Sequence, residues 1–245
     1  MVSVNSYGQI IGDALPNWQV CTFPERKTLR GKFCRLEPLK VEKHGRNLFS
    51  SFSQMGDDRL WTYVPLGPFK DYDDFENVYA KLAQDSSALH FAILTAETDL
   101  PIGTIALIRI DNGNGSIEIG FVVFSPALQR TPMASECQFL LMKYVFEDLG
   151  YRRLEWKCDS LNEPSKACAQ RLGFHFEGTF RNAAVYKGRS RDTSWLSITD
   201  YEWPIIQKSF EAWLKDNNFV EGKQQRRLVD IRMEIAKGAE HHKFP

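Results

Sequence analysis

The sequence predicts an α/β domain of the α+β kind, in which helices cover a mixed central sheet. Two observations indicate this class. Short apolar runs with a period of two, typical of strands, are interspersed with longer stretches whose apolar residues recur at helical spacing. The resulting element order is β-α-α-β-β-β-α-β-α-β-β, and the alternation in its second half favours a mixed sheet with helices packed on it.

The first half of this order contains the consecutive strands. An Asp-Asn-Gly-Asn-Gly run over residues 111–115 joins the last two of them, because Asn-Gly pairs favour tight hairpin turns. The glycosylation sequon that begins at Asn114 is interpreted as part of this turn. The expected strands cover residues 33–38, 90–94, 102–110 and 117–124, and the expected helices cover residues 41–52 and 72–84.

The second half alternates between helix and strand. Gly150 and Gly173 each follow a predicted helix, at the position where glycine commonly ends a helix. The expected helices cover residues 133–149, 162–172 and 204–214, and the expected strands cover residues 153–158, 174–186 and 193–198, with a turn at 187–190 between the last two.

The chain of 245 residues fits one domain with an additional arm. Residues 1–31 mix glycine, proline and isolated aromatics without a clear period, and we expect an arm there. The main domain is expected over residues 32–217 and a charged tail over residues 218–245. Leu228, Ile231 and Ile235 are spaced to form the stripe of a tail helix, and a loosely ordered tail fits the composition equally well.

Composition excludes several classes of function. Lys plus Arg and Asp plus Glu both number 31, so the electrostatic reason to propose nucleic acid or an anionic membrane as partner is absent. The five cysteines are odd in number and lack C-x-x-C spacing, which argues against a disulfide framework or a zinc site. No signal-peptide pattern or long apolar run is present. We therefore expect a soluble cytoplasmic protein without metal, as a monomer or homodimer.

Residues 129–134, Gln-Arg-Thr-Pro-Met-Ala, follow a predicted strand and open a predicted helix. Thr131 is suited to cap this helix, and Pro132 suits its first position, where a missing N–H costs nothing. A helix start presents unpaired N–H groups and the positive end of the helix dipole, to which Arg130 adds a charge. The segment is a candidate anion site, although most helix starts bind nothing.

The same segment resembles the pyrophosphate loop of the GNAT superfamily of N-acetyltransferases, written Q/R-x-x-G-x-G/A. Gln129 and Ala134 match its ends, and Pro132 takes the usual glycine position. The resemblance extends over about residues 33–203, and it is nearest to the branch with the bacterial ribosomal-protein N-terminal acetyltransferases. Four ordered motifs are similar to that branch: Glu118-Ile119-Gly120-Phe121, Ala134-Ser135-Glu136, Asn162-x-x-Ser165 and Leu172-Gly173-Phe174-x-x-Glu177-Gly178-x-x-Arg181.

This resemblance implies a mostly antiparallel GNAT-like sheet, acetyl-CoA as cofactor and a primary amine as acceptor, on a protein N-terminus or a small molecule. Since Pro132 leaves the following N–H groups free, we expect the phosphates to rest on the N–H groups of residues 131 and 133–135. The implied cofactor-binding residues are Val122, Val123, Phe124, Gln129, Arg130, Thr131, Met133, Ala134, Ser135, Asn162 and Ser165.

The implied reaction is direct attack of the amine on the thioester, which needs a base and a donor for the leaving thiolate. Glu118 is the candidate base, and an outward-facing strand carboxylate is the alternative. In related enzymes the residue at Asn162 contacts the pantetheine arm and that at Ser165 assists the thiolate, and ordinary helix capping explains both equally well. The tyrosine acid of many members falls at Ala169, which shifts that role to Ser165 or solvent.

The acceptor side is the least defined. Trp61, Tyr63 and Phe69 lie in a proline-rich connection that commonly borders the acceptor in this superfamily, and the alternative is that they roof the core. Glu136 is expected to be structural. Two other function classes stay open: a non-catalytic acyl-CoA-binding or sensing module, and an interaction protein that lost its ligand.

Overall fold

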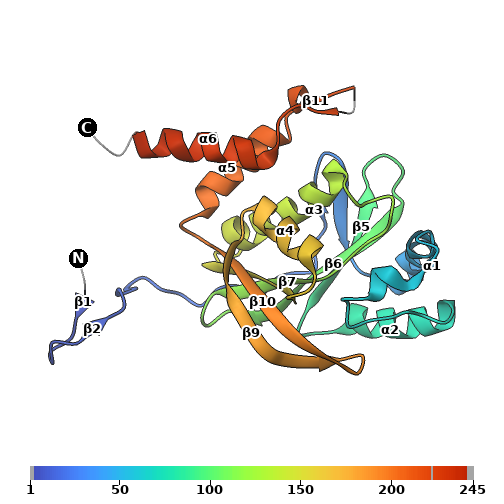
Figure 1. Cartoon of the computed structure of the whole chain (residues 1–245), viewed down its shortest axis with the longest axis horizontal. Coiled ribbons are helices and arrows are strands. Elements are labelled where there is room, and N and C mark those ends of the chain that lie inside the picture. Colours follow the sequence, from blue (N-terminus) through green and yellow to red (C-terminus); the bar gives the residue numbers. More distant parts are fainter. Residues whose placement is uncertain (1–2, 222, 242–245) are drawn as a thin grey trace.

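A twisted eight-stranded sheet forms the centre of the molecule (Figure 1). The computed structural model describes residues 3–221 and 223–241. All neighbouring strands of the sheet are antiparallel except β7 and β8, which are parallel. In spatial order the strands are β3 (Leu29–Arg30), β4 (Cys34–Pro38), β5 (Leu89–Thr95), β6 (Pro101–Asp111), β7 (Ser116–Phe124), β8 (Arg153–Asp159), β10 (Arg189–Thr199) and β9 (His175–Tyr186).

Helices cover both faces of this sheet. On β5, Phe91 and Ile93 belong to one buried cluster, whereas Ala92 and Leu94 belong to another, because successive side chains of a strand point to opposite faces. The helices on the second face are α1 (Val41–Ser53) and α2 (Tyr72–Gln84), joined by a connection with the short helix η1 (Asp58–Trp61). The helices on the first face are α3 (Pro132–Lys143), α4 (Glu163–Leu172), α5 (Trp203–Trp213) and α6 (Leu228–His241).

This architecture confirms the predicted class, a mixed and mostly antiparallel sheet flanked by helices. Two elements differ in detail from the sequence expectation. The helix expected over residues 133–149 continues beyond α3 as a π-helical turn, Tyr144–Asp148. The turn between β9 and β10 is only Lys187–Gly188, with φ of 48° and 69°, so the strands stay paired up to Tyr186 and Arg189.

The ends of the chain extend beyond the main sheet. Strands β1 (Ser3–Val4) and β2 (Ile10–Ile11) form a small hairpin away from the body (Figure 1). β3 lies within the expected arm and pairs with β4. At the other end come η3 (Asp216–Asn218), β11 (Phe219–Val220) and β12 (Lys223–Gln224), and then α6, which packs on α5 and α4. Of the two readings of the tail, the helix is the one observed, with Leu228 and Ile231 buried.

No helix in the described part of the chain is both long and apolar enough to span a membrane.

Candidate functional site

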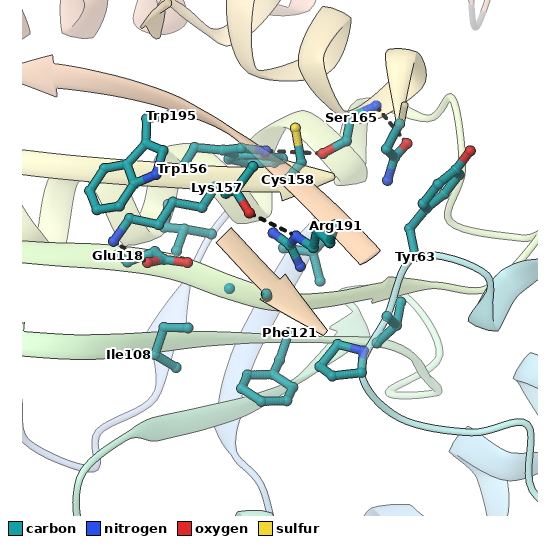
Figure 2. A pocket seen from close by; sticks show the side chains of 18 of the residues that line it. Tyr63, Ile108, Glu118, Phe121, Trp156, Lys157, Cys158, Ser165, Arg191 and Trp195 are labelled. Atoms are coloured by element: carbon teal, nitrogen blue, oxygen red, sulfur yellow. Dashed lines mark hydrogen bonds and ion pairs between the residues drawn. The ribbon is translucent and has the colours of Figure 1, made fainter. Parts of the chain in front are cut away.

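A cleft of about 510 Å³ opens between β7 and β8 (Figure 2). These parallel strands pair from Ser116 with Arg153 as far as Ile119 with Trp156, and no pairing follows. The β9–β10 hairpin and the connection between α1 and α2 complete its walls. The lining residues are Tyr63, Val64, Pro65, Ile108, Arg109, Glu118, Ile119, Gly120, Phe121, Val122, Trp156, Lys157, Cys158, Asn162, Ser165, Phe180, Ala183, Ala184, Arg191, Thr193 and Trp195.

A β-bulge in β7 shapes the floor of the cleft. Ala106 pairs with Gly120 and Thr104 with Val123, so two residues of β7, Phe121 and Val122, oppose a single residue of β6. Phe121 has φ of 47°, an uncommon conformation for a residue with a side chain. A bulge leaves a backbone group outside the ladder, and bulges are frequent next to active sites. The bulge thus places unpaired backbone beside the cleft.

Glu118 is buried among cations. It is only 3% exposed, and it lies 2.6 Å from Arg109 Nη1 and 3.0 Å from Lys157 Nζ. Lys157 is shared with Glu155, at 2.7 Å, and its ammonium stands 3.8 Å from the centroid of the Trp195 ring. The carboxylate therefore faces the cleft rather than bulk solvent, and the two cations fix its position.

Ser165 and Asn162 lie at the start of α4, on another wall of the cleft. Asn162 Oδ1 accepts from the Ser165 N–H at 3.2 Å, so the asparagine does cap the helix. Ser165 Oγ accepts from Trp156 Nε1 at 3.0 Å, which leaves the hydroxyl proton available to a second partner. The structure thus brings Glu118, Asn162 and Ser165 to the lining of one cleft.

The loop over residues 129–134 lies outside the lining of the cleft, at the start of α3. Arg130 adopts φ of 61°, a left-handed conformation that helps backbone N–H groups converge as an anion-binding nest. Thr131 caps the helix, with its Oγ1 3.3 Å from the Ala134 nitrogen, and Gln129 Nε2 donates to the Phe124 carbonyl at 2.9 Å. The loop is therefore held in place by its own side chains.

Three of the four N–H groups expected to hold phosphate already have acceptors within the chain, and that of Ser135 donates to the Thr131 carbonyl in the first intrahelical bond of α3. The Ala134 N–H donates to Thr131 Oγ1, and the Thr131 N–H donates to the Leu128 carbonyl at 3.4 Å. Both bonds are long, so they are weak competitors for an anion. Ser135 is also engaged, since its Oγ accepts from Arg171 Nη2 at 3.0 Å, which adds a guanidinium at this end of the helix.

The other expected cofactor residues divide by position. Val122 lines the cleft, whereas Val123 is buried in the cluster under α1 and α2. Phe124 and Met133 pack against the other core cluster. Direct contact with a ligand in the cleft is thus open to Val122, and the side chains of the other three support the walls.

Of the three aromatic residues expected at the acceptor side, only Tyr63 lines the cleft. Its hydroxyl donates to the Leu161 carbonyl at 3.3 Å, next to Asn162. Trp61 and Phe69 are in edge contact, with centroids 4.9 Å apart, inside the aromatic cluster beneath α1 and α2. These two residues roof the core, as in the alternative interpretation.

The β9–β10 hairpin forms a wall that sequence reasoning did not assign to the site. Lys187 Nζ at its tip donates to the carbonyls of Trp61 and Leu66, at 2.6 and 2.8 Å, and Arg189 Nη2 donates to the Thr62 carbonyl at 2.8 Å. Along the hairpin, Phe180 stacks on Trp195 with centroids 4.6 Å apart. In the sequence, the Lys-Gly pair predicted the turn of this hairpin, but it did not indicate which part of the chain the tip of the hairpin contacts.

The thiols of the chain are suited to packing rather than to nucleophilic chemistry. Burial raises the pKa of all five cysteines, including Cys158 in the cleft, so they are protonated thiols near neutral pH. Among the described residues, no group of three or more His, Cys, Asp or Glu side chains is placed to hold a metal ion.

Comparisons with known proteins agree with this geometry. A family model described as an acetyltransferase (GNAT) domain matches residues 35–175. The N-acetyltransferase p20 of Bacillus licheniformis is 29% identical over 184 residues, which cover 74% of this chain and 97% of p20. YdaF of Bacillus subtilis, which carries a ribosomal N-acetyltransferase name, is 27% identical over 75% of this chain and 96% of its own length.

One solved structure is more similar in sequence than these two relatives. The crystal structure of a GCN5-related N-acetyltransferase from Brucella melitensis superposes with a TM-score of 0.88 and 42% identity, covering 89% of this chain and 100% of that one. These matches confirm the family and the fold expected from the motifs.

Proposed function

The chain belongs to the GNAT family of acetyltransferases, and we propose that it moves the acetyl group of acetyl-CoA to a primary amine by direct attack in the cleft between β7 and β8. The observation that carries the proposal is the convergence of Glu118, Asn162 and Ser165 on this cleft, beside the β-bulge at Phe121. A base, a hydrogen-bond donor for the leaving group and free backbone are the parts that aminolysis of a thioester needs.

The residues at the two ends of the site fit coenzyme A. At the start of α3, the left-handed Arg130, the helix N-terminus and the Arg171 guanidinium suit a pyrophosphate. We assign its phosphates to the N–H group of Met133 first, since those of Thr131 and Ala134 have intramolecular acceptors and that of Ser135 donates within α3. The pantetheine arm is then held between Val122 on β7 and Asn162 on α4.

Each side chain has one task in the reaction. An amine acceptor is mostly protonated at neutral pH, since α-amino groups have pKa values of about 8 and lysines of about 10. Glu118 takes the proton from the attacking nitrogen, directly or through water. Free backbone at the bulge stabilises the negative charge that develops on the carbonyl oxygen. As the carbon–sulfur bond breaks, the Ser165 hydroxyl donates a hydrogen bond to the thiolate.

We propose that the acceptor amine belongs to a protein N-terminus or to a small molecule. It attacks the thioester directly, and no side chain of the enzyme acts as a nucleophile. The raised pKa of the Cys158 thiol supports direct attack, because Cys158 is the cysteine that lines the cleft. We also propose that the expected boundaries, residues 32–217, enclose everything that this chemistry uses.

A thiol-release assay with acetyl-CoA tests the proposal against a panel of peptides, polyamines and amino sugars. Glu118→Gln should lower kcat/KM by about 100-fold or more, the usual contribution of a positioned base. Glu155→Gln is the matched control, because Glu155 contacts the same Lys157 without lining the cleft. Equal losses in the two variants would show that Glu118 only maintains the ion-pair cluster.

Ser165→Ala tests the second role, the hydrogen bond from the Ser165 hydroxyl to the leaving thiolate. We expect it to lower kcat by about tenfold with little change in coenzyme A affinity, because the lost hydrogen bond forms only as the thiolate leaves. Near-normal turnover in both Glu118→Gln and Ser165→Ala would overturn these assignments. Tight coenzyme A binding by calorimetry without transfer to any amine would instead support the acyl-CoA-binding module.

A further inference from the structure

Arg191 is a cation that lines the cleft, on strand β10. The charged residues of the lining are Arg109, Lys157, Arg191 and Glu118. The first two cations share Glu118. Within the described part of the chain, no carboxylate lies within ion-pair distance of the Arg191 guanidinium, and its one side-chain hydrogen bond, 3.1 Å long, runs from Nε to Thr193 Oγ1.

The acidic residues near Arg191 accept hydrogen bonds from other groups. Asp159 accepts from the Tyr186 hydroxyl at 2.8 Å, and Asp192, the next residue in the chain, accepts from the Asn182 N–H at 2.7 Å. The centroid of the Tyr186 ring lies 5.7 Å from the guanidinium carbon and Thr193 Oγ1 accepts from Nε, so the head group is held in place, and its terminal nitrogens have no hydrogen-bond acceptor among the described residues. Figure 2 shows the guanidinium projecting into the cleft.

The cleft walls around the Arg191 guanidinium are aromatic. Trp156 and Phe121 lie on β8 and β7, and Phe180 stacks on Trp195 in the hairpin. An uncompensated guanidinium in a partly apolar cleft favours a planar anion, since two parallel N–H groups match the two oxygens of a carboxylate. The pyrophosphate loop lies outside this lining, so Arg191 is placed to act on the acceptor rather than on the cofactor phosphates.

We infer that the acceptor is a primary amine that also carries a carboxylate and an apolar body, and that Arg191 binds the carboxylate. This inference rests on the proposed acetyl transfer and names its substrate class. A carboxylate near the amine occurs in a free amino acid and in a peptide with an acidic first residue. The cleft volume of about 510 Å³ is typical of a small-ligand site.

The test compares acceptors with and without a carboxylate, and phenylalanine and its amide differ in that group alone. Initial rates of thiol release are measured with phenylalanine, phenylalanine amide and an Asp-Phe amide peptide, each normalised to its unprotonated amine fraction. We expect kcat/KM for a carboxylate-bearing acceptor to exceed that for phenylalanine amide by about 10- to 100-fold. The free amino acid and the acidic peptide distinguish the two sources of the carboxylate.

Variants of Arg191 supply the second readout. Arg191→Gln should raise the KM of the preferred acceptor by about 10- to 100-fold, leave kcat within a few-fold, and leave phenylalanine amide unaffected. Arg191→Lys should restore only part of the affinity, because an ammonium lacks the planar fork. A folded Arg191→Gln variant, checked by circular dichroism, should keep the wild-type KM for acetyl-CoA.

The contrary results are distinguishable. Equal rates for phenylalanine and its amide in the wild type, or equal losses for both in Arg191→Gln, would overturn the role of Arg191 and leave the proposed acetyl transfer intact. A rise in the KM of acetyl-CoA alone would assign Arg191 to the cofactor and overturn the inference. If no amine of the wider panel releases thiol, the proposed function and this inference fail together.

Discussion

Glu136 connects the first turn of α3 to the chain segment that leads into β4. Its carboxylate is buried and accepts three backbone hydrogen bonds, from the N–H groups of Lys32 at 2.6 Å, Phe33 at 2.7 Å and Cys34 at 2.9 Å. A carboxylate that accepts several N–H groups supplies the acceptors that these backbone donors need. We therefore predict that Glu136 is a major contributor to the free energy of unfolding.

The magnitude follows from these three bonds. Hydrogen bonds to a charged group contribute roughly 1.5 to 3 kcal/mol each and are not additive, so Glu136→Ala should lower the free energy of unfolding by about 3 to 5 kcal/mol. For a domain of this size that corresponds to a fall in Tm of roughly 6 to 20 °C. Glu136→Gln should lie between, because its amide retains one acceptor oxygen and turns an NH2 toward N–H donors.

Chemical denaturation followed by tryptophan fluorescence measures this effect. The matched control is Glu211→Gln, an exposed carboxylate on α5, which should change stability by less than about 0.5 kcal/mol. Gly31→Ala probes the same contact from the other side, since a Cβ there would lie 2.5 Å from Glu136 Cδ. A change of less than about 1 kcal/mol in Glu136→Ala would refute the reasoning.

Two further predictions concern pH and the hairpin wall. Burial lowers the pKa of His90 to about 4, whereas the unfolded chain binds that proton below about 6.5, so stability is fully present above pH 6.5 and falls between about 6.5 and 4. Urea titrations across this range should show a shallower fall in His90→Phe, and an unchanged slope would contradict the assignment. Lys187→Met removes two hydrogen bonds to the α1–α2 connection and should raise the KM of the amine by about tenfold, with that of acetyl-CoA within about twofold. Unchanged steady-state constants would show that the wall does not need this clamp.

Much of the fold was predictable because local patterns and long-range packing agree in this chain. The Asn-Gly run defined the β6–β7 hairpin, and Gly173, with φ of 118°, ends α4 as expected. The two-residue β3 was missed because so short a strand has no period of its own. It exists only because β4 supplies its hydrogen bonds.

The candidate site was only partly predictable. Glu118, Asn162 and Ser165 follow from motifs, and the structure shows that separate elements bring them to one cleft. Arg191 and Trp195 left no local signal, because their position depends on how the β9–β10 hairpin folds back over the cleft. The burial of Trp61 also depends on a tertiary contact, with Phe52 and Phe69, that composition alone does not define.

A crystal structure of the chain with coenzyme A tests the central claim most directly. The account predicts the pyrophosphate at the start of α3, on the N–H group of Met133. It also predicts the thiol in the cleft, between the bulge at Phe121 and the hydroxyl of Ser165. A thiol that lies outside this cleft, or a pyrophosphate held away from residues 129–135, would contradict the account.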